Sequence, residues 1–285
     1  MPVDLALTRD QLLDHARALP AAPRVMAELC ELLQDINTDL DQVSGVIRAD
    51  PALGARVIRI SNSVVYGGGM QVSSIDEAVN RVGFEEVLRL VGTASVAGFV
   101  DRSLSMYGVE ADDVRSSLLL HALACEALAR QTSLDPHTAY TAGLLRGMGM
   151  MVLDRAARGK LAPNFAYDPQ HFPTYLEWET KRFGLGSPDV TRMVLDEWRF
   201  PDVVISAIDE QLLRQPHHYQ NALACVVNLA GSVVNDTGLA LPGDRPHWIV
   251  TPEKLAGAGI DEEQFHNAAE LAWQHYNRHG AGLSR

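Results

Sequence analysis

Signals that begin a helix recur along almost the whole 285-residue chain. Two segments, starting at Thr8 and Ser74, have the spacing of a capping box, in which two side chains satisfy the free N–H groups of a first turn. Four dipeptides place a capping side chain before a proline suited to the first helical position: Asp50-Pro51, Asp135-Pro136, Ser187-Pro188 and Thr251-Pro252. No alternating apolar segment carries hairpin turn residues. The sequence therefore predicts an all-α protein.

The apolar residues agree with this prediction and indicate how the helices are grouped. A buried seam at intervals of four and three residues is formed by Val114, Leu118, His121, Cys125 and Leu128. Residues 143–153 read as the apolar start of one buried helix, and residues 261–278 as a C-terminal helix. A polar, glycine-containing break at 101–112 predicts two packed helical lobes, residues 1–106 and 107–285. Residues 237–252, rich in proline and glycine, predict a surface loop.

Composition and charge exclude several classes of function. The chain is 47% hydrophobic and 21% charged, which is typical of a globular protein. Its formal net charge of −12 argues against a nucleic-acid or anionic membrane surface. No apolar run reaches the roughly 18–20 residues that span a bilayer, and no secretory signal is visible. Three widely spaced cysteines suggest neither a disulfide framework nor a zinc site. We expect a cytoplasmic protein.

One extended pattern covers the first half of the chain. It consists of residues 19–23 (LPAAP), 50–63 (DPALGARVIRISNS), 66–67 (YG), 74–79 (SIDEAV) and 81–83 (RVG). This pattern resembles the HDOD domain, a helical relative of the HD phosphohydrolases found in bacterial signalling proteins. The resemblance extends over roughly residues 12–235. It implies an HDOD-type N-terminal bundle followed by a degenerate HD-like bundle.

The second half departs from the HD pattern wherever an active relative would hold a metal ion. His121 fits the first histidine of the HD core. The other ligand positions are occupied by Arg146, Gly147, Ser187, Gln211, Leu212 and Gly231. A hydrolytic metal site needs several histidine and carboxylate ligands, and a protonated arginine repels a cation. The resemblance thus implies a pseudo-phosphohydrolase, not an enzyme, with no metal or other cofactor.

His121 and Arg146 each have two interpretations at this stage. His121 is either a relic ligand or proton sensor, or a core histidine that is hydrogen-bonded to a neighbour. Arg146 either grips an anion such as a nucleotide phosphate in the old active-site hollow, or pairs with a nearby acid and plugs that hollow. We favour the core histidine and the plug, because no second ligand and no second basic residue accompany them.

A second candidate site lies on the helix predicted after Asp50. Arg56, Arg59 and Asn62, together with Tyr66, could form a surface that docks a partner protein, since Tyr and Arg are common interface anchors. Alternatively, Asn62 and Tyr66 tie the following loop to the helix through side-chain hydrogen bonds. The sequence favours neither the docking surface nor the loop contact over the other.

The resemblance implies an output or adaptor role, often downstream of two-component or cyclic-di-GMP signalling. The leading prediction is a non-catalytic module that contacts a separate signalling protein. The alternatives are a nucleotide or anion sensor that uses the hollow near His121 and Arg146, and a phosphohydrolase with a relocated metal site. The sequence leaves the partner and the oligomeric state open.

Overall fold

The computed structural model describes residues 4–19, 22–35, 37–62, 71–160, 162 and 165–279. Within these ranges the regular elements are helices, and β pairing is limited to a single bridge between Leu104 and Val109. The all-α prediction is confirmed. None of the helices in the described ranges is long and apolar enough to cross a membrane.

All the predicted capping residues except Ser187 cap their helices, and they explain where several helices begin. Thr8 forms a complete capping box at the start of α1 (Arg9–Arg17). The carboxylate of Asp50 accepts the N–H groups of Ala52 and Leu53, both at 3.0 Å, at the start of α4 (Pro51–Ser61). Gly83 ends α5 (Ile75–Val82) with φ of 77°, a conformation that favours glycine. Local side-chain chemistry therefore fixes these helix ends.

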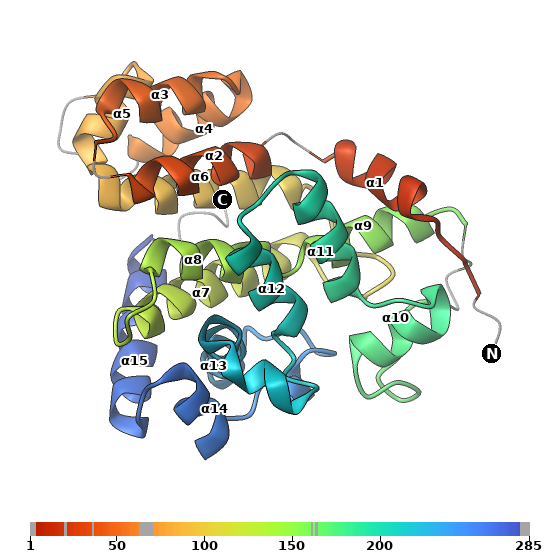
Figure 1. Cartoon of the computed structure of the whole chain (residues 1–285). Helices are drawn as coiled ribbons and strands as arrows, with labels where there is room; N and C mark the ends of the chain where they lie inside the picture. Colours follow the sequence, from red (N-terminus) through yellow and green to blue (C-terminus); the bar gives the residue numbers. More distant parts are fainter. Residues whose placement is uncertain are drawn as a thin grey trace.

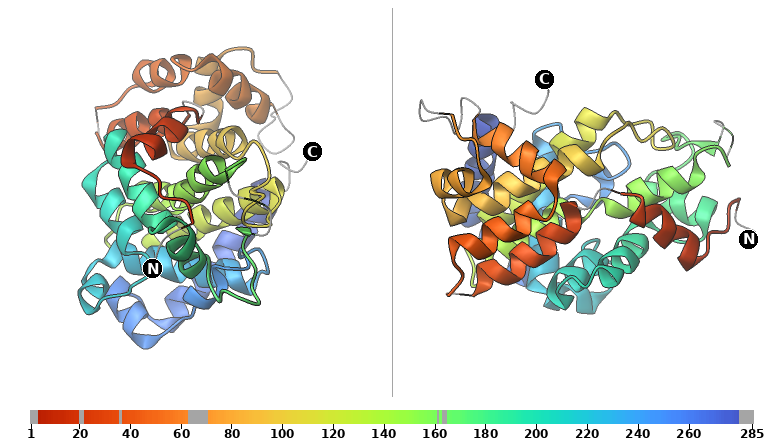
Figure 2. Two further views of the ribbon diagram at one scale, coloured as in Figure 1. Left: turned by 90° about the vertical axis from the view of Figure 1, so that its right-hand side faces the viewer. Right: turned by 90° about the horizontal axis from the view of Figure 1, so that it is seen from above.

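The first group of helices packs around α6 (Phe84–Phe99), as Figure 1 shows. Both α2 (Ala22–Gln34) and α4 lie against α6, while α3 (Leu40–Arg48) packs on α5. The two further views in Figure 2 show the same group on one side of the molecule.

The second group is centred on α7 (Ala111–Ala129), whose five predicted seam residues are all buried. This helix packs against α8 (Pro136–Leu145), α13 (Ala222–Asp236) and α15 (Glu262–His279). The predicted C-terminal helix is thus confirmed. The remaining elements are α9 (Met148–Ala157), α10 (Tyr175–Phe183), α11 (Ser187–Glu197), α12 (Asp202–Glu210), α14 (Pro252–Ala258) and the 3₁₀ helices η2 (Pro216–Gln220) and η3 (Arg245–His247).

The two groups meet where α2 and α6 pack on α7 and α8, and one hydrophobic core runs through both. The division at residue 106 stays a prediction. One element assigned to the first lobe lies elsewhere: α1 packs on α9 and α11, in the second group (Figure 1).

The apolar stretch 143–153 is not the start of one helix, as its sequence predicted. The chain leaves α8 after Leu145 and enters α9 at Met148. A Cβ on Gly147 would lie 2.9 Å from Leu118 Cδ2, so a side chain has no room at this break. The interruption places Arg146 at the end of α8, where its side chain can reach α12 and the connection between α13 and α14.

Candidate functional site

The guanidinium of Arg146 is the centre of a buried polar cluster. Its side chain is only 6% exposed. Nε donates to Oε1 of Gln211 at 2.8 Å, and Nη2 donates to Oδ2 of Asp244 at 2.7 Å. The guanidinium also lies 4.8 Å from the ring centroid of Trp248, within cation–π range. One cation and one carboxylate balance each other, so no net charge remains to attract an ion.

Two partners of Arg146 come from a segment that the sequence predicted as a surface loop. That prediction is wrong for its central part, where Ala240, Leu241, Asp244 and Trp248 are buried. Asp244 and Trp248 were not among the residues predicted for the site. The available signal was Trp248 itself, because a tryptophan is usually highly buried; the neighbouring Ile249 and Val250 are exposed.

His121 contacts the same indole. Its ring packs edge-on against Trp248, with centroids 5.7 Å apart, and its Nε2–H donates to the carbonyl of Val227 at 2.8 Å. Burial, helped by the positive charge of Arg146, holds the pKa of His121 well below its ordinary value. The ring is therefore neutral and hydrogen-bonded, as expected of a core histidine.

The fold brings several former ligand positions together around Trp248. Gln211 holds Arg146, and a Cβ on Gly231 would overlap the Trp248 indole. Arg146, Gly231 and His121 thus contact one ring, and Gln211 joins the cluster through Arg146. Ser187 lies further away, where its N–H donates to Glu179 at 2.6 Å, and Leu212 packs on the core. These residues form a packed aromatic and ionic cluster, whose donor set does not fit a cation.

Enlarging Gly231 tests this packing. Gly231→Ala is expected to lower the free energy of unfolding by about 1–3 kcal/mol, because the indole must shift to admit a methyl group. The matched control is Gly45→Ala in α3, where a Cβ meets nothing within 4 Å. That change is expected to stabilise by about 0.5–1 kcal/mol. Urea denaturation measures both free energies of unfolding. Equal changes in the two variants would show that the Trp248 indole does not fill the space beside Gly231.

A second buried polar group was missed by sequence analysis. Glu179 of α10 accepts the Tyr107 hydroxyl at 2.7 Å as well as the N–H of Ser187. Burial raises the pKa of this carboxyl to about 7. The rings of Tyr107, Tyr175 and Trp178 pack edge to face around it. Glu179 thus titrates near neutral pH within the core.

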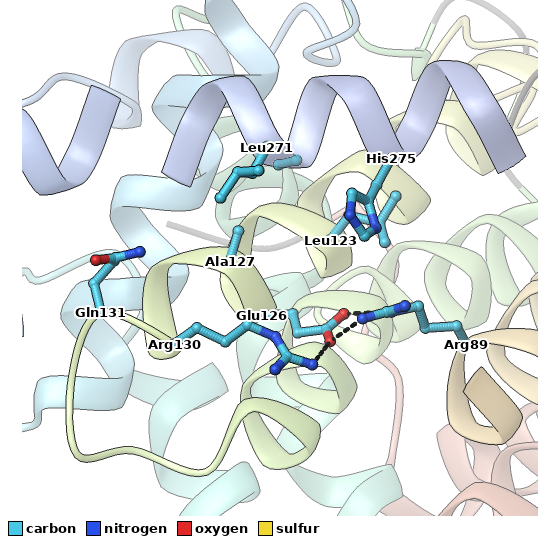
Figure 3. Close-up of a pocket in the computed structure, with 9 residues that line it drawn as sticks. Arg89, Leu123, Glu126, Ala127, Arg130, Gln131, Leu271 and His275 are labelled. Atoms are coloured by element: carbon cyan, nitrogen blue, oxygen red, sulfur yellow. Dashed lines mark hydrogen bonds and ion pairs between the residues drawn. The ribbon is translucent and has the colours of Figure 1, made fainter. Parts of the chain in front are cut away.

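The lobes are joined by a buried ion pair beside a small cavity (Figure 3). Glu126 of α7 accepts Nε and Nη2 of Arg89, from α6, at 2.8 and 2.6 Å, and Nη2 of Arg130 at 2.9 Å. Leu271 and His275 of α15 line the other side. The cavity volume of about 100 Å³ is well below the roughly 300–1,000 Å³ of ligand pockets. It has no room for a nucleotide.

The candidate docking residues on α4 differ in their surroundings. Arg59 is exposed, whereas Arg56 is half-buried and its guanidinium occupies the space above Gly98 of α6. Asn62 donates to the carbonyl of Val72 at 2.8 Å and accepts its N–H at 2.7 Å. Asn62 therefore ties the two ends of the α4–α5 connection together. Tyr66 lies outside the described residues.

Comparison with known proteins shows which family this chain belongs to. The HDOD domain family model matches residues 19–212, more than half of the chain. An uncharacterized protein of Treponema pallidum (strain Nichols) is 24% identical over 260 residues. The match covers 88% of this chain and 48% of that protein, so the chain spans about half the length of this curated relative.

Two solved structures share the fold. A protein of Shewanella amazonensis SB2B, provisionally named a phosphohydrolase, has a TM-score of 0.66 at 24% identity, covering 96% of this chain and 98% of its own. A protein of Marinobacter aquaeolei VT8, provisionally named a signal transduction protein, has a TM-score of 0.65 at 20% identity, covering 96% and 64%. At these identities the likeness concerns the fold alone.

Proposed function

Because the chain belongs to the HDOD domain family, we propose that it is a non-catalytic regulatory module of bacterial signal transduction. It acts in the cytoplasm through protein–protein contacts. The observation that carries this proposal is the buried Arg146–Asp244 ion pair, because the family resemblance assigns the position of Arg146 to an HD metal ligand. The name of the Marinobacter relative is consistent with a signalling role.

The chemistry of the site supports the absence of catalysis. Metal-dependent hydrolysis needs several imidazole or carboxylate ligands and an open position for water. Here the one retained imidazole uses its Nε2–H to bond Val227, and the one carboxylate is paired with a guanidinium. Binding a cation would break both contacts and place it beside a permanent positive charge. The cluster is a scaffold and a pseudo-active site.

The exposed side of α4 is the proposed partner surface, centred on Arg59 with Arg56 beside it. An acidic partner would be complementary to these two charges. A link to two-component or cyclic-di-GMP signalling, as the family resemblance implies, would come through that partner.

Charge reversal tests this surface. We expect Arg56→Glu/Arg59→Glu to lose a partner that the wild-type chain retains from a lysate of its own bacterium. Arg9→Glu/Arg17→Glu, the same charge change on exposed residues of α1, is the control. Circular dichroism verifies folding, and Arg59→Glu alone avoids the half-buried Arg56. If every partner stays bound to both α4 variants, the surface is elsewhere.

Anion or nucleotide sensing at His121 and Arg146 is the alternative. It is favoured by one observation: Asp244, which an anion would displace from Arg146, lies on a connection between helices and not within one. Isothermal titration with a panel of nucleotides discriminates the two functions. If a folded protein gives no binding heat with any nucleotide of the panel, the sensing function is contradicted.

A further inference from the structure

Two histidines and a glutamate that belong to neither the Arg146 cluster nor the α4 surface lie together. Glu210 is the last residue of α12, and His217 and His218 are on η2. The candidate ligand atoms of all three lie within 4.8 Å of one another. The two imidazoles meet edge to face, with centroids 4.5 Å apart.

The backbone between these residues holds them in place. Leu213 adopts a left-handed conformation, with φ of 49°, and turns the chain back on itself after α12. Pro216 then begins η2. Asn221, the capping residue of α13, donates to Oε2 of Glu210 at 2.8 Å and fixes the carboxylate. The short path from Glu210 to His218 is thus closed into a tight turn.

One ring nitrogen in this cluster lacks a partner. Nδ1 of His218 is shielded from solvent, and among the described residues it has no hydrogen-bond partner. A shielded ring nitrogen normally requires a donor, an acceptor or a metal ion. His217 is exposed, so its ring is free to rotate towards the other two ligands.

We propose that Glu210, His217 and His218 bind one divalent transition-metal ion, of which Zn²⁺ is the best fit. Two imidazoles and a carboxylate form a ligand set that Zn²⁺ accepts, whereas Ca²⁺ and Mg²⁺ prefer oxygen ligands alone. Zn–N bonds of about 2.0–2.1 Å place tetrahedral ligand atoms about 3.4 Å apart. Binding therefore requires rotations of the exposed His217 and half-buried His218 rings that shorten the present separations of up to 4.8 Å. Water completes the coordination.

Metal binding here clips the end of α12 to η2 and closes the turn 211–215. The first residue of that turn is Gln211, whose side chain accepts a hydrogen bond from Arg146 and donates one to the carbonyl of Ile208 at 2.9 Å. An ion bound next to Gln211 therefore stabilises the segment that supports the pseudo-active site. The proposal is independent of the partner surface on α4.

Zn²⁺ titration of the full chain, purified without a histidine tag, tests the site. We expect one equivalent of Zn²⁺ to bind and to raise the Tm. His217→Ala, His218→Ala and Glu210→Gln should each weaken binding by at least about tenfold. Glu210→Gln keeps an acceptor for Asn221, so it removes the charge with little structural change. The Co²⁺-loaded protein should show the strong visible absorption of a tetrahedral site.

Two controls separate this site from others. His171→Ala removes an exposed histidine paired with Asp168 at 2.7 Å, outside the cluster, and should leave Zn²⁺ affinity unchanged. His121→Ala, shown to be folded by circular dichroism, should leave the Zn²⁺ affinity unchanged as well. A loss of affinity in the folded His121→Ala protein would instead place the ion in the former HD centre and contradict the proposed function. The metal proposal is overturned if Zn²⁺ does not bind, or if either His217→Ala or His218→Ala, shown to be folded, retains wild-type affinity.

Discussion

Replacing Arg146 by methionine is expected to lower the free energy of unfolding by about 3–5 kcal/mol, the usual cost of removing one member of a buried ion pair. The Asp244 side chain, 12% exposed, would lose its cation, and Oε1 of Gln211 would lose its donor. Methionine fills much of the same volume, so the loss reports the polar contacts more than a cavity. Urea denaturation followed by circular dichroism measures it.

Two further variants decide whether the effect belongs to the pair. Arg9→Met removes an exposed ion pair with Asp196, at 3.5 Å, and should cost less than about 1 kcal/mol. Arg146→Met/Asp244→Leu replaces the whole pair by apolar side chains and should recover much of the lost stability. An Arg146→Met protein within about 1 kcal/mol of wild type would show that Arg146 does not hold the cluster together.

The second large effect concerns pH and Glu179. This carboxyl titrates near 4.5 in the unfolded chain and at a pKa of about 7 in the folded protein, because burial disfavours its charged form. Between these two values the folded state binds the additional proton. Stability contributed by this group is therefore complete below pH 4.5 and is lost as the pH rises through 7. The expected loss is about 3 kcal/mol.

Glu179→Gln isolates this contribution. Glutamine is neutral at every pH, yet it can still accept the Ser187 N–H and contact the Tyr107 hydroxyl. The variant should match wild type near pH 5 and be more stable near pH 8. His121, whose lowered pKa costs stability as the pH falls below 6.5, acts equally on both proteins and cancels in the difference. Parallel stability profiles would show that Glu179 does not titrate in the core.

The helices could be predicted from sequence because their determinants are local. Thr8, Asp50, Asp135 and Thr251 each cap a helix within three residues of their own position. At α11 the capping residue was predicted one position too late. The N-cap is Gly186, and the predicted cap, Ser187, is the first residue of the helix. The prediction failed at 146–147, because a continuous apolar run carries no local signal for the break between α8 and α9.

The candidate site could be predicted only in part. The family resemblance located His121, Arg146, Gln211 and Gly231, and the fold brings these into one cluster around Arg146 and the Trp248 indole. The partner of Arg146 was out of reach, since Asp244 is 98 residues away and lies in a segment whose proline and glycine content suggested an exposed loop. The Tyr107–Glu179 bond, across 72 residues, was hidden for the same reason. Long-range pairing of polar side chains has no local signal.

The central claim is that the Arg146 cluster has replaced a catalytic metal centre. Its most direct test is hydrolysis of bis(para-nitrophenyl) phosphate by the purified full chain in the presence of excess Mn²⁺, Fe²⁺ or Zn²⁺. We predict no release of nitrophenolate above the rate in buffer with metal alone. Metal-dependent release that His121→Ala abolishes would contradict the account.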